Sequence, residues 1–209
     1  LNYNFLVEYF DSGDTTGGEN DIRISELSLV NGRFNYINEH RDIDTTFGID
    51  WNHLRLSALD LSVNKFSLLG DSIHADIGKL SLKESSGFQL HELSHELTLA
   101  NNIVDMRNTR LAFEESDIRG DLRFEVASID DFDYFDTRVP MQHEFREAKL
   151  NMNDLSYFAP ELRGMDQPVI INGSVKGTVS NLKGRKLTLT LNDHTRFEGN
   201  IDMEGLPEL

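Results

Sequence analysis

The sequence contains one pattern of residues that is typical of an enzyme. His91-Glu92-Leu93-Ser94-His95 matches H-E-x-x-H. On a helix, the two imidazoles of this pattern lie on one face and bind zinc, while the glutamate acts as general base toward the metal-bound water. Glu114 or Glu115 would then supply a third ligand. Read as a helix, the motif predicts a zinc hydrolase.

The residues around this motif favour a strand instead. Apolar and polar side chains alternate at Phe88 and Leu90 before it and at Leu97 after it. In a strand, His91 and His95 lie about 13 Å apart, which is too far for one zinc ion to bind both. We therefore predict a strand surface, no enzymatic activity, no metal and no other cofactor. The zinc hydrolase remains the alternative.

Two acidic clusters and the single tryptophan are the other candidate sites. Acids gather in the glycine-containing stretch 11–21 and in 130–136. Neither cluster has the Asp-x-Asp-x-Asp-Gly spacing and distal glutamate of a calcium loop, so both are expected to be solvated charge. Trp51 is expected to be a core anchor or a sheet corner, and a glycan-binding surface is the alternative.

The overall composition excludes several classes of function. With 36 acidic and 20 basic side chains, the net charge is -16, which repels nucleic acid. The absence of cysteine excludes thiol nucleophiles, disulfides and thiolate metal sites. No apolar run approaches the roughly 20 residues that span a membrane, and no secretion signal follows Leu1. We expect an internal fragment of a longer protein.

The chain alternates apolar and polar residues almost from end to end, which predicts strands with one buried and one solvated face. Stretches 130–138 and 154–162 break the alternation with spacings of three and four and predict short helices. The acidic stretch 11–21 is expected to be a flexible loop. The expected turns are Asn31-Gly32, Gly70-Asp71, Ser86-Gly87, Gly120-Asp121, Asn172-Gly173 and Lys183-Gly184.

A loose repeat runs through the strand-rich region. Its frames begin at Leu27, Leu54, Leu80 and Leu111, at steps of about 26 to 31 residues, within the range of stacked repeats. We therefore predict a single repetitive region over 1–209 with an all-β, mainly antiparallel fold. It is expected to be an elongated, curled sheet that resembles a groove.

Several segments resemble bacterial TamB proteins of the wider AsmA-like group. They are Asp154-Leu155-Ser156-Tyr157-Phe158-Ala159-Pro160-Glu161-Leu162, Val169 to Gly177, Asn181-Leu182-Lys183-Gly184, Ile24 to Phe34, Ser86-Gly87-Phe88 with Leu90, and Phe197-Glu198-Gly199. The resemblance covers most of the chain with degenerate motifs. The family's N-terminal anchor and C-terminal region are missing, and the H-E-x-x-H pattern is not a family feature.

This resemblance implies a periplasmic segment of a parent protein that is anchored in the inner membrane. It also implies a role in outer-membrane biogenesis. Phospholipid or other acyl chains would move along a greasy groove, or the segment would assist an outer-membrane barrel protein of the assembly machinery in protein secretion.

A sheet with one apolar face must have that face covered, either by a second sheet or by acyl chains. The sequence leaves both arrangements open. We expect one continuous inner surface lined by Leu27, Leu29, Phe34, Leu54, Leu56, Leu80, Leu82, Phe88, Leu111, Phe113, Leu122 and Phe124.

Overall fold

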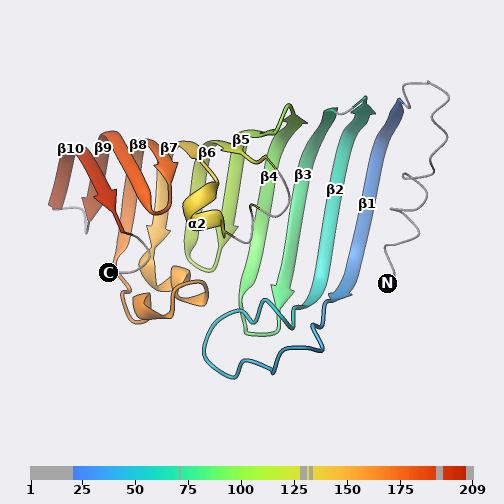
Figure 1. Ribbon diagram of the computed structural model, residues 1–209, viewed down its shortest axis with the longest axis horizontal. Coiled ribbons are helices and arrows are strands. Elements are labelled where there is room, and N and C mark those ends of the chain that lie inside the picture. The colour runs from blue at the N-terminus through green and yellow to red at the C-terminus, as the bar shows by residue number, and fades with distance from the viewer. Residues whose placement is uncertain (1–20, 71, 128–130, 132–133, 192–194, 206–209) are drawn as a thin grey trace.

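One antiparallel sheet of ten strands makes up most of the molecule (Figure 1). The computed structural model describes residues 21–70, 72–127, 131, 134–191 and 195–205. Within these residues, each strand pairs with the strands that precede and follow it in sequence, and the first strand does not pair with the last. The prediction of an all-β, antiparallel and elongated fold is confirmed, and the sheet is open.

The strands are long and similar in length. They are β1 (Ile22–Asn35), β2 (Arg55–Leu69), β3 (Ser72–Glu84), β4 (Gln89–Ala100), β5 (Ile103–Phe113), β6 (Ser116–Glu125), β7 (Met141–Asn151), β8 (Pro168–Thr178), β9 (Asn181–Leu191) and β10 (Thr195–Glu204).

A shift of register, the mark of a β-bulge or similar irregularity, interrupts each of the nine strand pairs. A bulge adds one residue to a strand, so apolar residues three positions apart remain on one face when they lie on either side of it. In β1, Leu29 precedes the bulged Asn31, whose φ is 52°, and Gly32 follows it.

A side chain of the neighbouring strand caps several of these bulges. In each case the backbone N–H of a residue with positive φ donates to an Asp or Asn side-chain oxygen. The four caps join Asn31 to Asp60 at 2.8 Å, Asn108 to Asp121 at 2.8 Å, Glu147 to Asn172 at 2.8 Å and Lys186 to Asn200 at 2.9 Å.

Four of the six expected turns are wrong. Asn31-Gly32, Gly120-Asp121, Asn172-Gly173 and Lys183-Gly184 lie inside strands. The reason is that bulges, like tight turns, favour residues that tolerate unusual backbone conformations, so the dipeptide alone does not separate the two. Ser86-Gly87 does connect β3 to β4, and Gly70 follows β2.

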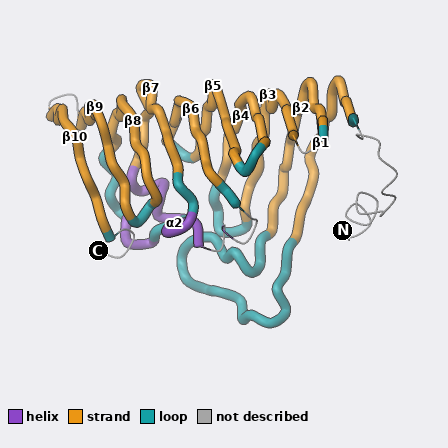
Figure 2. The backbone as a smooth tube through the Cα atoms, turned by 45° about the horizontal axis from the view of Figure 1, so that its top comes forward, coloured by secondary structure: helices purple, strands orange, loops and turns teal. Residues whose placement is uncertain are grey.

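The predicted short helices are confirmed. They are α2 (Phe135–Arg138) in the first stretch, and the 3-10 helices η2 (Met152–Tyr157) and η3 (Pro160–Leu162) in the second. Figure 2 shows these helices and the longer loops gathered on one side of the row of strands. None of the described helices is long and apolar enough to cross a membrane. The predicted flexible loop lies outside the described residues except for Asp21.

Candidate functional site

Rows of apolar side chains cross the sheet perpendicular to its strands. Residues directly opposite each other in an antiparallel pair point to the same face, so successive pairs trace one row. The first row touches all ten strands, and glycine is its one member without a side chain. It consists of Ile22, Leu68, Ile73, Leu99, Val104, Phe124, Met141, Gly177, Leu182 and Met203.

Two further rows lie on the same face. The second consists of Ala75, Leu97, Met106, Leu122, His143, Val175, Gly184 and Ile201. The third runs in two parts, through Leu29, Leu61, Leu80, Leu93, Leu111 and Ile118 on β1 to β6, and through Ala148, Ile171, Leu189 and Phe197 on β7 to β10. We call the surface of these three rows the apolar face.

The predicted lining residues divide by their surroundings. Leu27, Leu29 and Phe34 on the edge strand are 49%, 41% and 43% exposed. Leu80, Leu82 and Leu111 instead pack around Phe88, Leu90 and Phe113. Leu56 pairs with Phe34, and Leu122 and Phe124 belong to the rows above. Leu54 and Phe88 precede β2 and β4 rather than lying in them.

Two loop segments cover the cluster around Phe88 and Phe113. Ile49, Leu155 and Tyr157 pack against it, and the ring of Phe88 meets the rings of Tyr157 and Phe158 edge-on at 5.5 and 5.3 Å between centroids. We call residues 47–51 and 155–158 the plug. Because of the plug, Phe113 is only 4% exposed, so this part of the apolar face is closed to a ligand.

Hydrogen bonds hold the plug to the sheet. The Asp154 carboxylate accepts from the Ser116 hydroxyl at 2.6 Å and from the backbone N–H of Glu115 at 3.0 Å. The Ser116 hydroxyl oxygen in turn accepts the backbone N–H of Asn151 at 2.9 Å. The backbone N–H of Ile49 donates to the carbonyl of Tyr157 at 3.1 Å, which joins the two halves of the plug.

A smaller cover lies farther along the central strands. The ring of Phe135 in α2 lies 5.8 Å from that of Phe124, which belongs to the first row. The backbone N–H of Ser180 donates to the carbonyl of Asp136 at 2.9 Å and ties this segment to the turn between β8 and β9. Leu97, Met106 and Leu122 of the second row thus lie between the plug and this cover.

Two buried histidines interrupt the apolar face. His95 pairs with Ile77, and His143 pairs with Leu122 and stacks on Phe145 with 3.8 Å between ring centroids. Nδ1 of His95 and Nε2 of His143 are buried without a hydrogen-bond partner. Burial lowers the pKa of both, that of His143 to about 4, so both rings are neutral at pH 7.

The H-E-x-x-H residues lie in strand β4, so the helical geometry required by the zinc hypothesis is absent. His91 is exposed, whereas His95 is buried on the apolar face. Glu92 is bound elsewhere, because its carboxylate accepts a hydrogen bond from Arg110 at 2.6 Å. In the described part of the chain, no three His, Asp or Glu side chains are arranged to hold a metal ion.

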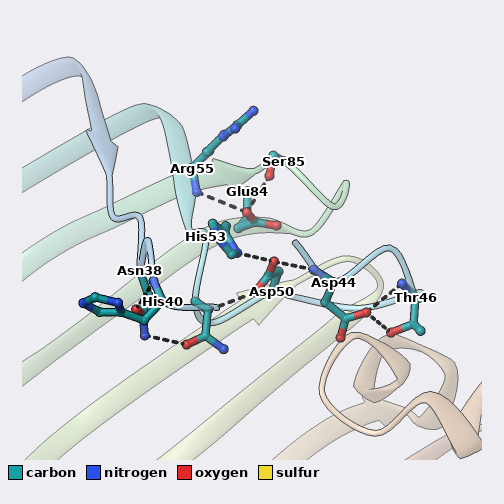
Figure 3. A network of polar contacts seen from close by, with 10 residues as sticks. Asn38, His40, Asp44, Thr46, Asp50, His53, Arg55, Glu84 and Ser85 are labelled. Atoms are coloured by element: carbon teal, nitrogen blue, oxygen red, sulfur yellow. Dashed lines mark hydrogen bonds and ion pairs between the residues drawn. The ribbon is translucent and has the colours of Figure 1, made fainter. Parts of the chain in front are cut away.

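The loop between β1 and β2 contains a cluster of polar side chains around Asp50 (Figure 3). One Asp50 oxygen lies 2.8 Å from Nδ1 of His53 and accepts the backbone N–H of Asp44 at 2.9 Å, and its other oxygen accepts the N–H of Asn52 at 2.9 Å. Burial raises the pKa of Asp50, but these hydrogen bonds outweigh it and the net pKa is lowered. The cluster therefore holds the loop in shape.

Trp51 differs from its expected role as a core anchor. Its side chain is 58% exposed, and its ring lies 6.2 Å from that of Phe158 at the outer side of the plug. The expectation of a core anchor is therefore wrong, because the indole packs on one face and leaves the other in solvent, whereas the expectation of a sheet corner stays a prediction.

The opposite face of the sheet is polar and carries a network of ion pairs. Arg110 forms ion pairs with Glu92 and Asp117, and Arg119 also pairs with Asp117. These hydrogen bonds and charges lower the pKa of Asp117, with the bond from Arg119 as the largest cause.

Comparison of the chain with protein-family models, with curated proteins and with solved structures finds no match.

Proposed function

We propose that this chain is a periplasmic segment of a TamB-like protein of the AsmA-like group and that its apolar face holds the acyl chains of phospholipids. The segment would support outer-membrane biogenesis by carrying lipid along that face. Its second role within the same proposal is to assist assembly of an outer-membrane barrel protein. The parent protein would be anchored in the inner membrane.

The observation that supports this proposal is the first row, which crosses all ten strands and is covered by α2 at Phe124. Nine spacings of about 4.8 Å between ten strands give it a length of about 43 Å. One leaflet of a bilayer has a hydrocarbon thickness of about 15 Å. Among the described residues, all strands belong to one sheet, so no second sheet covers this row. An apolar surface of this extent favours a partner, and an acyl chain of about 15 Å would cover about one third of its length, which leaves room for movement along it.

Hydrophobic contact suits transport as well as binding. Burying a methylene group contributes about 0.8 kcal/mol, so a few contacted methylenes already give appreciable affinity. The interaction is non-directional, so a chain can move along the row without breaking specific bonds. The plug and the α2 cover leave the second row between them as the path across the central strands, and that path contains Leu97, Met106 and Leu122.

A matched pair of variants tests the proposal on purified protein. Leu29 and Ser28 are adjacent, both exposed, and point to opposite faces of β1. Leu29→Asp puts a charge on the apolar face and should weaken binding of a fluorescent phospholipid about tenfold, because an unpaired carboxylate is costly in an apolar contact. Ser28→Asp adds the same charge on the polar face and should leave binding unchanged. Equal affinities of both variants would contradict the proposal.

A further inference from the structure

The plug is built from two arms that reach over the apolar face from opposite sides. Residues 47–51 belong to the loop between β1 and β2, and residues 155–158 belong to the segment between β7 and β8. In Figures 1 and 2, the loop extends past β3 and β4 toward the helical segment that follows β7. The arms meet above Phe88, Leu90 and Phe113, at the start of β4 and the end of β5. The plug therefore crosses the middle of the sheet.

The plug interrupts the third row, whose two ends are exposed. Leu29 on β1 and Phe197 on β10 are 41% and 42% exposed. Between them, Leu80, Leu93 and Leu111 pack with the cluster beneath the plug. An acyl chain that moves along this row would have to displace the plug.

Each arm is fixed near its base, whereas the joint between the arms is slight. The carboxylate of Asp50 braces the first arm within its own loop. The carboxylate of Asp154 ties the second arm to Ser116 at the start of β6. Among the described residues, one backbone hydrogen bond joins the two arms, from the N–H of Ile49 to the carbonyl of Tyr157.

Aromatic rings make up the rest of the joint. The ring of Phe47 lies 5.2 Å from that of Tyr157, and the Arg163 guanidinium lies over Phe47 at 4.4 Å. Trp51 and Phe158 form the outer ring pair and are 58% and 48% exposed, so water reaches this pair. An acyl chain would bury the same apolar surface of the cluster that the arms bury, which offsets the cost of separating them.

We propose that the plug is a lid whose arms part at this joint and admit an acyl chain to the third row across β4, β5 and β6. This inference rests on the proposed function, because it adds a gated path for the same ligand beside the second row. The structure holds the closed state, in which Phe113 is 4% exposed. In the open state, Phe88, Leu90 and Phe113 contact the acyl chain in place of the arms.

A covalent link across the joint tests the lid, because the chain contains no cysteine of its own. In a W51C/F158C chain, a short bis-maleimide would join the two arms at their exposed outer side. The linked protein should bind a fluorescent phospholipid about fivefold more weakly than the same protein before linking. S28C/S62C, a directly opposite pair on the polar face of β1 and β2, is the control and should bind equally before and after linking. Binding that the link between the arms leaves unchanged would overturn the lid and leave the proposed function standing.

A second measurement detects opening without lipid. W51A removes one ring of the joint and should speed thiol labelling of L90C, a position that is 8% exposed beneath the plug, about tenfold. A75C, at a position that is 9% exposed in the second row on β3, reports global unfolding and should be labelled at the same rate with and without W51A. Any other pattern of labelling would overturn the lid. Failure of every form to bind phospholipid would overturn the proposed function, and the lid with it.

Discussion

The backbone N–H of Asn108, in the left-handed conformation with φ 52°, donates a hydrogen bond of 2.8 Å to the side chain of Asp121 on the neighbouring strand. The bulge at Asn108 keeps Met106 and Leu111 on the apolar face although they are five positions apart. The cap satisfies an amide that the bulge removes from the regular ladder. This relationship links a local backbone irregularity to the continuity of the rows.

Removing the cap at Asn108 should destabilise the sheet. Asp121→Ala leaves the amide without its partner and should cost about 1–2 kcal/mol in the free energy of unfolding, measured by urea denaturation. Asp121→Asn retains a side-chain oxygen and should cost less than half as much. Both variants also lose the ion pair of Asp121 with Arg146. If both variants lose the same stability, this ion pair contributes more to the free energy of unfolding than the cap does.

The plug should depend on Asp154. Asp154→Ala leaves the buried Ser116 hydroxyl and the Glu115 amide without their acceptor, so we expect a loss of about 1–3 kcal/mol. The variant should also expose Phe88 and Phe113, which an increase in hydrophobic-dye binding would report. Glu161→Ala, an exposed acid of the neighbouring 3-10 helix, is the control and should change neither quantity. Unaltered stability of Asp154→Ala would show that ring packing alone holds the plug.

Acid should destabilise the protein through His143. Its pKa is about 4 in the folded state, below the ordinary value near 6.5, because burial disfavours the charged ring. The unfolded state therefore binds more protons between these values. The stabilising contribution is complete above about pH 6.5 and is lost as pH falls toward 4.

The part of this contribution that is lost between pH 7 and pH 5 amounts to about 2 kcal/mol. Urea midpoints at pH 7 and pH 5 would measure it. His143→Gln cannot titrate, so its difference between the two pH values should be smaller by about that amount. The same pH dependence in the variant and the parent chain would refute the assignment to His143.

Substitution of the two histidines of H-E-x-x-H should change stability by different amounts. His95→Ala removes a buried ring from the apolar face and should cost about 1–3 kcal/mol, whereas His91→Ala changes an exposed side chain and should stay within about 0.5 kcal/mol. Metal analysis of chelator-free protein completes the test. Stoichiometric zinc that either substitution removes would re-establish the hydrolase hypothesis.

The alternation of side chains made the fold predictable. Pairs such as Leu97 and Leu99 in β4 have the period of a strand, and the spacing of Leu155 and Phe158 differs enough to predict the helix that interrupts it. Local periodicity therefore predicts the class of the elements but not the number of strands, because four of the expected turns lie inside strands.

Contacts between segments that are distant in the sequence could not be predicted from local sequence patterns. The bulge at Asn108 is stabilised by Asp121, thirteen residues later, and the plug brings Ile49 against Tyr157. The sequence also does not show that His95 belongs to the apolar face, since a bulge-dependent register decides which side chains face inward. Trp51 was misjudged because its exposure depends on where the loop folds.

Site-specific photocrosslinking in the intact cell envelope tests most directly whether acyl chains lie on the apolar face. Photoreactive residues would replace Leu29 and Leu122 on the apolar face, and Ser28 and Arg123 on the polar face of the same strands. We predict phospholipid adducts at Leu29 and Leu122 and none at Ser28 and Arg123. Adducts at neither pair, or equally at both, would contradict lipid carriage along this face.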